Sequence, residues 1–270
     1  MPTFVRLLIT TFITAACLAP ALAAPCNTGH FDRWLEGVRQ EAAAKGVSPR
    51  GIAQGLAEVR FDPAIVRRDR GQHVFKQSFE EFSARMINPR MKLAENMMRR
   101  YASLLSRIEQ LYGVPAPVLV AIWGLETGFG SFNGSFPTLT ALASLAYDCR
   151  RADMFRSELI EALKIVDRGD MRPAQMKGAW AGEIGQTQFM PSSFIKYAVD
   201  FDSDGRRDVI HSTADALAST ANYLKGYGWR AGAGWEPGEP NFAVIQQWNK
   251  ADVYSRTIAR FATRLSQSVK

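Results

Sequence analysis

One ionisable side chain, Glu126, stands at the end of an apolar segment and directly before a run of glycines. In "VPAPVLVAIWGLETGFG", prolines suit a helix start and Gly128 suits its end, which predicts a helix over residues 115–127. The helix lacks a polar side and should be buried. Burial and the helix dipole both raise the pKa of this carboxyl, as a general acid requires. The alternative is a structural glutamate that accepts N–H groups of the following loop.

A second glycine-rich stretch, "KGAWAGEIGQTQFMPSSF", alternates amide and aromatic side chains. Amides that bind hydroxyl and N-acetyl groups, beside rings that cover sugar faces, are typical of a carbohydrate cleft. We therefore expect Trp180 and Phe189 to bind sugar. Taken alone, the same rings also fit a hydrophobic core.

The two stretches together resemble the lytic murein transglycosylases of the membrane-bound type B family. The likeness rests on "ETGFG", on "GEIGQTQFMPSSFIKYAVDFDSDGRRD" about fifty residues later, and on "ADALASTANYLKGYGW" and "YSRTIARFATRL". The resemblance implies a lysozyme-like core that cleaves the MurNAc–GlcNAc bond of peptidoglycan without water as nucleophile. One glutamate protonates the glycosidic oxygen and then accepts the proton of the C6 hydroxyl, which closes a 1,6-anhydro ring. No cofactor is implied for this chemistry.

The resemblance also assigns individual residues of the site. Glu126 matches the catalytic acid, and Gln188 and Tyr223 match positions that contact substrate. Two positions depart from the family pattern. Ala179 replaces a serine, which removes one hydroxyl near the acid, and Trp248 stands where a tyrosine is common. We include Trp248 among the expected substrate-binding residues.

A second carboxyl, Glu183, leaves the reaction type open. Conventional glycosidases use two carboxyl groups about 5 Å apart when they retain configuration, and further apart when they invert it. We interpret Glu183 as part of the local structure. If it faces Glu126 at the retaining distance, hydrolysis by a lysozyme-like muramidase becomes the better interpretation. A third hypothesis is a non-catalytic cell-wall binding protein with the same fold.

The segment "DFDSDGRRDVIH" fits the first half of an EF-hand loop. Oxygen ligands would come from Asp200, Asp202, Asp204 and the Arg206 carbonyl, while His211 replaces the usual glutamate. As a late aspartate does in the relatives, Asp215 would complete a structural Ca²⁺ or Na⁺ site. The alternative is a turn whose acids pair with neighbouring arginines.

The first 24 residues read as a secretory signal cleaved near Ala23 or Ala24, with Arg6 ahead of an apolar run. Cys17 within it gives only a faint lipid-attachment signal. Removal of Arg6 lowers the formal net charge from +7 to +6. A basic exported protein favours acidic cell-wall polymer over nucleic acid as its partner. We expect a periplasmic monomer without a transmembrane segment in the mature chain.

Two cysteines remain after cleavage, and an even number in an oxidising compartment predicts a disulfide between Cys26 and Cys149. Two free thiols are the alternative. Scattered histidines and the lack of a GxSxG elbow give no support for a zinc or a serine-nucleophile enzyme.

Helical periodicity dominates the chain, so the predicted fold class is mainly α with minor β structure near residues 178–190. The clearest long helix lies in "PRMKLAENMMRRYASLLSRIEQLYG", residues 89–113, where Gly113 supplies the stop. We divide the mature chain into an N-terminal helical lobe (25–112) and a lysozyme-like core that carries the EF-hand-like loop (113–236). A C-terminal helical segment (237–270) should pack on the N-terminal lobe.

Overall fold

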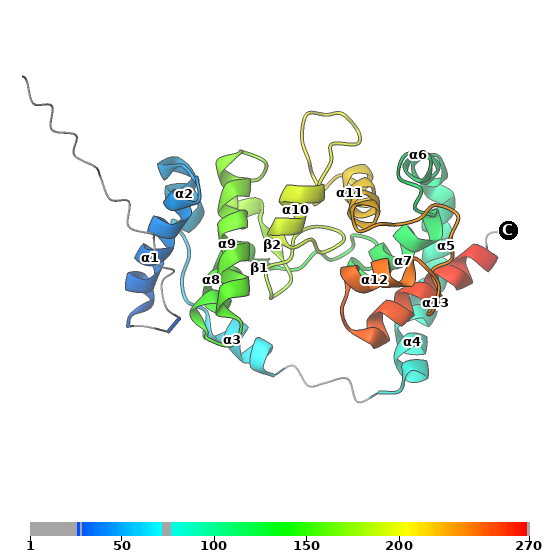
Figure 1. The fold of residues 1–270 in the computed structure, drawn as a ribbon, viewed down its shortest axis with the longest axis horizontal. Helices are drawn as coiled ribbons and strands as arrows, with labels where there is room; N and C mark the ends of the chain where they lie inside the picture. The colour runs from blue at the N-terminus through cyan, green and yellow to red at the C-terminus, as the bar shows by residue number, and fades with distance from the viewer. Residues whose placement is uncertain (1–25, 28, 72–76, 269–270) are drawn as a thin grey trace, which may run out of the picture.

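The structure, a computed structural model, describes residues 26–27, 29–71 and 77–268. The expected signal segment, with Cys17 and the cleavage site at Ala23 or Ala24, lies outside these residues. The described part is mainly helical, as predicted (Figure 1). The α-helices are α1 (Phe31–Ala44), α2 (Pro49–Leu56), α3 (Pro63–Arg70), α4 (Phe79–Ile87), α5 (Met91–Arg100), α6 (Ala102–Tyr112), α7 (Ala116–Thr127), α8 (Thr138–Tyr147), α9 (Ala152–Asp167), α10 (Pro191–Tyr197), α11 (Thr213–Gly226), α12 (Phe242–Trp248) and α13 (Asp252–Ser268). Two 3₁₀ turns, η1 (Asn88–Arg90) and η2 (Pro173–Gln175), complete the helical structure.

The N-terminal segment does not form one lobe. Helices α1, α2 and α3 pack against α8 and α9 at one end of the molecule. Helices α4, α5 and α6 lie at the other end, where they contact α7, α11 and α13 (Figure 1). The C-terminal helix α13 packs along α7 and α4, so it contacts both the expected core and part of the N-terminal segment. The domain boundaries at residues 112 and 236 stay predictions.

Helix α7 is the centre of the hydrophobic core. Every residue from Val118 to Leu125 is buried, which agrees with the missing polar side of its sequence. Pro115 enters the helix in an extended conformation, and Gly128 ends it with a left-handed φ of 58°. Gly124 has no side chain because the ring of Phe129 occupies that space; an added Cβ would lie 2.7 Å from it. The sequence therefore fixes both ends of the helix that carries Glu126.

The predicted long helix within residues 89–113 is wrong in one respect. It breaks at Tyr101, whose φ of −105° and ψ of 19° separate α5 from α6. The break lets both helices contact α7, and the Tyr101 ring packs edge-on against Trp123 at a centroid distance of 5.6 Å. Periodicity along the chain could not show this, because Ala94 on α5 and Ile108 on α6 face the same buried helix.

The β structure is small, as expected, and it joins two glycine-rich loops. Strand β1 (Phe136–Pro137) pairs antiparallel with β2 (Lys177–Gly178), and an isolated bridge links Ile184 to Phe189. An added Cβ on Gly178 would lie 1.6 Å from the Glu183 carbonyl oxygen, so only glycine permits this approach of two backbones. The ladder thereby holds the loop after α7 beside the loop that precedes α10.

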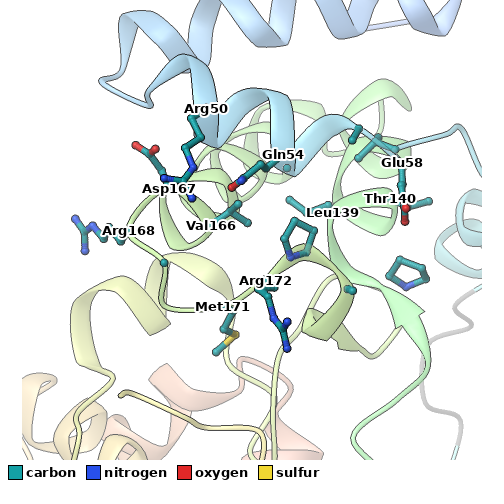
Figure 2. Close-up of a pocket in the computed structure, with 17 residues that line it drawn as sticks. Arg50, Gln54, Glu58, Leu139, Thr140, Val166, Asp167, Arg168, Met171 and Arg172 are labelled. Carbon is teal, nitrogen blue, oxygen red and sulfur yellow. The ribbon is translucent and has the colours of Figure 1, made fainter. Parts of the chain in front are cut away.

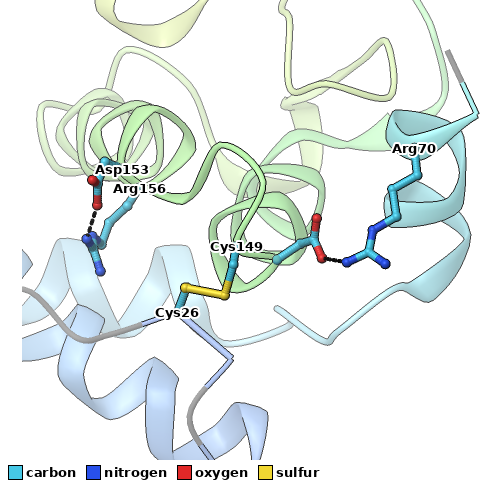
Figure 3. The surroundings of a disulfide bond; sticks show 6 residues. Cys26, Arg70, Cys149, Asp153 and Arg156 are labelled. Atoms are coloured by element: carbon cyan, nitrogen blue, oxygen red, sulfur yellow. Dashed lines mark hydrogen bonds and ion pairs between the residues drawn. A yellow bond between two sulfur atoms is a disulfide. The ribbon is translucent and has the colours of Figure 1, made fainter. Parts of the chain in front are cut away.

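The predicted disulfide between Cys26 and Cys149 is confirmed (Figure 3). The Cα atoms of the two cysteines are 5.3 Å apart, and the two residues are separated by 123 positions in the sequence. Beside it, Asn27 donates its N–H to the Tyr147 carbonyl at 3.0 Å, so the bond secures the start of the described chain to the end of α8. A cross-link over such a long loop constrains the unfolded chain strongly.

None of the helices in the described part of the chain is long and apolar enough to span a membrane by itself; α6 and α7 satisfy the criteria only as a pair bent by 112°.

Candidate active site

Glu126 lies in the last turn of α7 and lines a cavity of about 350 Å³. The cavity walls come from the loop before α10, from α10 and α11, and from the end of α12. The lining residues are Glu126, Ala179, Glu183, Gln188, Phe189, Met190, Ser193, Tyr223, Trp248 and Asn249. Four predicted site residues, Gln188, Phe189, Tyr223 and Trp248, therefore lie in the same cavity as the predicted acid. Their separation in sequence shows that the tertiary fold assembles the site.

The Glu126 carboxyl has a pKa raised to about 7, and desolvation by burial is the main cause. Two hydrogen bonds oppose this rise because they stabilise the charged form. Trp248 donates its indole N–H to Oε1 at 2.9 Å, and the Tyr254 hydroxyl of α13 also bonds to the carboxyl. A weaker electrostatic contribution from Glu183 acts in the raising direction. The carboxyl can thus both release and accept a proton near neutral pH.

Glu183 lines the same cavity, but backbone groups hold its carboxyl. Its Oε2 accepts the Ala181 N–H at 3.1 Å, and its own N–H also bonds to it. Burial raises its pKa despite these bonds and despite the positive charge of Arg151. The site therefore contains two carboxyl groups with raised pKa values, one on the buried helix and one on the facing loop.

Gln188 has a left-handed backbone, with φ at 57°, which is uncommon for a residue with a side chain. Its amide nitrogen donates to the Gly185 carbonyl at 2.7 Å and to the Asn133 carbonyl at 3.1 Å. These two bonds use both amide protons, so the side-chain carbonyl is the group left to accept a hydrogen bond from a ligand. The strained backbone and the two bonds fix this acceptor at the cavity wall.

The rings of Phe189, Tyr223 and Trp248 form one aromatic wall of the cavity. Tyr223 and Trp248 meet edge-on with centroids 5.0 Å apart, and Phe189 lies 5.5 Å from Trp248. The Tyr223 hydroxyl donates to the Gln247 carbonyl at 2.8 Å, which secures α12 to α11. Trp180 is half-buried against the core and is not among the residues that line this cavity. Its role as a sugar-binding residue stays a prediction.

The Asp loop forms a compact turn between α10 and α11. Candidate ligand oxygens of Asp200, Asp202 and Asp204 lie within 4.8 Å of one another, which suits a hard cation. Gly205 takes the sharp turn with φ at 87°. Asp215 is not part of this cluster, because its two carboxyl oxygens accept the N–H groups of Phe201 and Asp208. Asp215 thus supports both ends of the loop through backbone bonds, and the parts of Asp215 and of the Arg206 carbonyl in a cation site stay predictions.

A hydrogen-bonded link joins the Asp loop to the end of α7. The Thr127 hydroxyl donates to the Gln186 carbonyl at 2.5 Å, and the Gln186 N–H donates to the Val209 carbonyl at 2.9 Å. The Gln186 side chain also donates to the Ile210 carbonyl at 3.2 Å. Thr127 directly follows Glu126, so the loop conformation helps to fix the end of the helix that carries the acid.

A larger cavity of about 770 Å³ lies between α2 and the ends of α8 and α9 (Figure 2). Arg50 and Gln54 project into it from α2, opposite Val166 and Leu139. Its Asp167 carboxyl has a lowered pKa, chiefly because the Ser48 hydroxyl donates to it. An ionised, hydrogen-bonded carboxylate of this kind is no general acid, so the smaller cavity around Glu126 is the candidate active site.

Comparisons with known proteins show which family the chain resembles. Residues 30–238 match a family model described as "Transglycosylase SLT domain". Membrane-bound lytic murein transglycosylase B of Escherichia coli K12 is 41% identical over 150 residues, which cover 53% of this chain. That match covers only 41% of the length of the E. coli relative.

Two solved structures extend the likeness to most of the fold. SltB3 of Pseudomonas aeruginosa, in complex with NAG-anhNAM-pentapeptide, has a TM-score of 0.82 and 31% identity. This match covers 88% of the present chain and 80% of SltB3. The E. coli lytic transglycosylase Slt35, in complex with calcium, has a TM-score of 0.76 and 25% identity, over 87% of this chain and 93% of Slt35.

Sequence reasoning missed Tyr254, which bonds to the Glu126 carboxyl from α13. The contact and the burial together raise the Tyr254 pKa well above its usual value. Tyr254 opens the segment "YSRTIARFATRL", but nothing in that segment shows that it reaches a helix more than a hundred residues earlier. Ser193 and Asn249 were missed for the same reason: only the fold brings them to the cavity.

The raised pKa of Glu126 predicts a pH-dependent gain in stability for Glu126→Gln. The pKa of Glu126 is about 7 in the folded protein and 4.5 for an ordinary glutamate. The contribution of this carboxyl to the unfolding free energy is therefore fully present below pH 4.5 and is lost as pH rises from 4.5 through 7. Glutamine carries no charge and avoids this loss. Above about pH 7 the variant should be more stable by up to about 3 kcal/mol, as measured by denaturant unfolding.

The matched control is Glu36→Gln, which removes a carboxyl that is 61% exposed. It removes an exposed carboxyl and its ion pair with Arg39, so it should not give the gain in stability at neutral pH that is expected of Glu126→Gln. An equal stability difference between wild type and Glu126→Gln at both pH values would contradict the raised pKa.

Proposed function

The chain belongs to the transglycosylase SLT domain family, and from that membership we propose that it is a lytic transglycosylase of peptidoglycan. It cleaves the β-1,4 bond between MurNAc and GlcNAc without water and leaves a 1,6-anhydro-MurNAc end. The observation that carries this proposal is a single carboxyl, Glu126, with a pKa near neutrality in an aromatic-walled cavity.

The reaction needs one group that acts first as an acid and then as a base. The Glu126 carboxyl donates its proton to the glycosidic oxygen as the bond from that oxygen to C1 of MurNAc breaks. The carboxylate then takes the proton of the C6 hydroxyl, whose oxygen bonds to C1 and closes the anhydro ring. The proton returns to Glu126, so the step balances without water. A pKa of about 7 suits both transfers, since neither form is strongly favoured.

The cavity walls would bind the sugars around this carboxyl. Phe189, Tyr223 and Trp248 provide apolar ring surface, and the carbonyl of Gln188 accepts a hydrogen bond from an N-acetyl or hydroxyl group. Trp248 has a second role, since its indole N–H steadies the ionised form of Glu126 between the two transfers. Ala179 provides no hydroxyl where the family has a serine. Ser193, which lines the same cavity, provides one.

One observation favours a second function, hydrolysis by a lysozyme-like muramidase. Glu183 lies in the same cavity as Glu126, so two carboxyl groups are present, as in conventional glycosidases. Against this, the backbone N–H groups of Ala181 and of Glu183 itself already hold the Glu183 carboxyl within its loop. We therefore assign Glu183 to the support of the loop and place the chemistry on Glu126.

The Asp loop fits a structural cation, and the relative Slt35 was solved with calcium. Asp200, Asp202 and Asp204 would hold Ca²⁺ or Na⁺ through carboxylate oxygens. The ion would neutralise three clustered acids and make the loop more rigid. Because Gln186 bonds both to this loop and to Thr127, a rigid loop would also hold the end of α7 in place. The ion has no part in the proton transfers.

The proposed setting is the periplasm, reached through the predicted signal segment, with peptidoglycan glycan strands as the partner. The formal net charge of +6 that remains after removal of the signal segment favours an acidic cell-wall polymer as the partner. We expect the protein to act as a monomer.

Digestion of purified sacculi, followed by mass spectrometry, tests the reaction type. Wild-type protein should release muropeptides with 1,6-anhydro ends, and Glu126→Gln should lower their release by at least about 100-fold because the proton donor is lost. Glu183→Gln, the matched control, should keep the same products. Reducing-end muropeptides as the main wild-type product would contradict the lyase assignment and support the muramidase. Binding of sacculi without turnover would support a non-catalytic protein.

Calcium should stabilise the fold more than it promotes the chemistry. Addition of chelator to the calcium-loaded protein should lower the melting temperature by a few degrees, since the ion binds only the folded loop. The Asp202→Asn variant should lose most of this response, whereas Asp252→Asn, at an exposed acid on α13, should keep it. A melting temperature independent of calcium in the wild type would argue against an occupied site.

A further inference from the structure

The aromatic wall of the cavity does not end at the cavity mouth. From Trp248, which bonds to Glu126, the rings continue to Tyr223 at 5.0 Å and on to Tyr227 at 4.6 Å between centroids. Tyr227 caps the end of α11, one turn beyond Tyr223. This row leads from the Glu126 carboxyl to an exposed ring at the end of α11.

The outer end of this row is accessible to solvent. Tyr227 is 41% exposed, whereas Tyr223 is only 7% exposed. Phe61 has a similar exposure of 40%, but its ring packs with Phe31 and Tyr147, far from the cavity lining. Tyr227 is therefore an exposed ring joined directly to the wall of the candidate active site.

Neighbouring groups hold the Tyr227 ring in place. The Tyr227 ring packs on Tyr223, and Tyr197 packs against it at a centroid distance of 5.7 Å. The Lys196 ammonium lies 4.9 Å from the Tyr197 ring and 5.8 Å from the Tyr227 ring. Gly226 permits this packing, because a Cβ there would lie 2.4 Å from the Tyr197 ring. A fixed exposed ring loses little conformational entropy on binding.

We propose that Tyr227 and Lys196 form an outer sugar-binding subsite, one that takes a glycan unit beyond those held in the cavity around Glu126. This rests on the proposed function and adds to it a preference for longer strands. The exposed part of the Tyr227 side chain packs against an apolar face of a sugar ring, and the exposed Lys196 donates hydrogen bonds to its hydroxyls. Neither residue touches the reacting bond, so both affect binding rather than the chemical step.

Binding of defined strands tests the subsite without turnover. The protein carries Glu126→Gln, and calorimetry compares a peptidoglycan disaccharide with an octasaccharide from the same glycan. The parent should bind the octasaccharide more tightly. Tyr227→Ala should weaken octasaccharide binding by about two- to tenfold, the range typical of one aromatic contact, and leave the disaccharide unchanged.

Two variants separate ring contact from other effects. Tyr227→Phe keeps the ring and should keep the preference for long strands. Phe61→Ala removes an equally exposed ring elsewhere and should bind both strands as the parent does. Thermal unfolding checks that each variant is folded.

The outcomes distinguish this proposal from the proposed function. Equal weakening for both strands in Tyr227→Ala would mean that the change disturbs Tyr223, which overturns the subsite alone. Unchanged octasaccharide binding would do the same. If the parent binds neither strand, the substrate class itself is wrong and both proposals fail.

Discussion

The proposed chemistry depends on a balance of opposing effects on the pKa of one carboxyl group. Burial at the end of α7 disfavours the charged form of Glu126, while hydrogen bonds from Trp248 and Tyr254 favour it. With burial alone, the group would hold its proton too tightly to act as an acid. In an open, solvated position it would already be ionised. The result, a pKa of about 7, requires elements from three parts of the chain in one place.

Separate contacts hold those elements in place: a short β ladder, hydrogen bonds, helix packing and a disulfide. The β1–β2 ladder places the loop with Glu183 and Gln188 beside the loop that follows α7. Gln186 ties the Asp loop to Thr127, and α13 packs along α7 so that Tyr254 reaches the carboxyl. The Cys26–Cys149 disulfide fixes the far end, where α1 meets α8. A rigid frame of this kind keeps a buried carboxyl at a constant distance from its donors, which a constant pKa requires.

Local sequence signals predicted the parts of the site that lie within one segment. Prolines and Gly128 defined α7, and the missing polar side showed its burial, so the raised pKa of Glu126 followed from the sequence. Contacts between distant segments could not be predicted in this way. Tyr254 and Ser193 carry no local pattern, and the break at Tyr101 arises because two helices pack on α7. The resemblance implied that Gln188 and Tyr223 contact substrate, and both line the cavity. It did not show that the carboxyl oxygens of Asp215 accept hydrogen bonds from backbone N–H groups.

Direct titration of the Glu126 carboxyl tests the central claim best. The carboxyl carbon can be followed by NMR in protein labelled at glutamate side chains, and the signal can be assigned by its loss in Glu126→Gln. The balance of burial and hydrogen bonds predicts a midpoint near pH 7. A midpoint near 4.5, the value of an ordinary glutamate, would show that water reaches the group freely and would contradict the account.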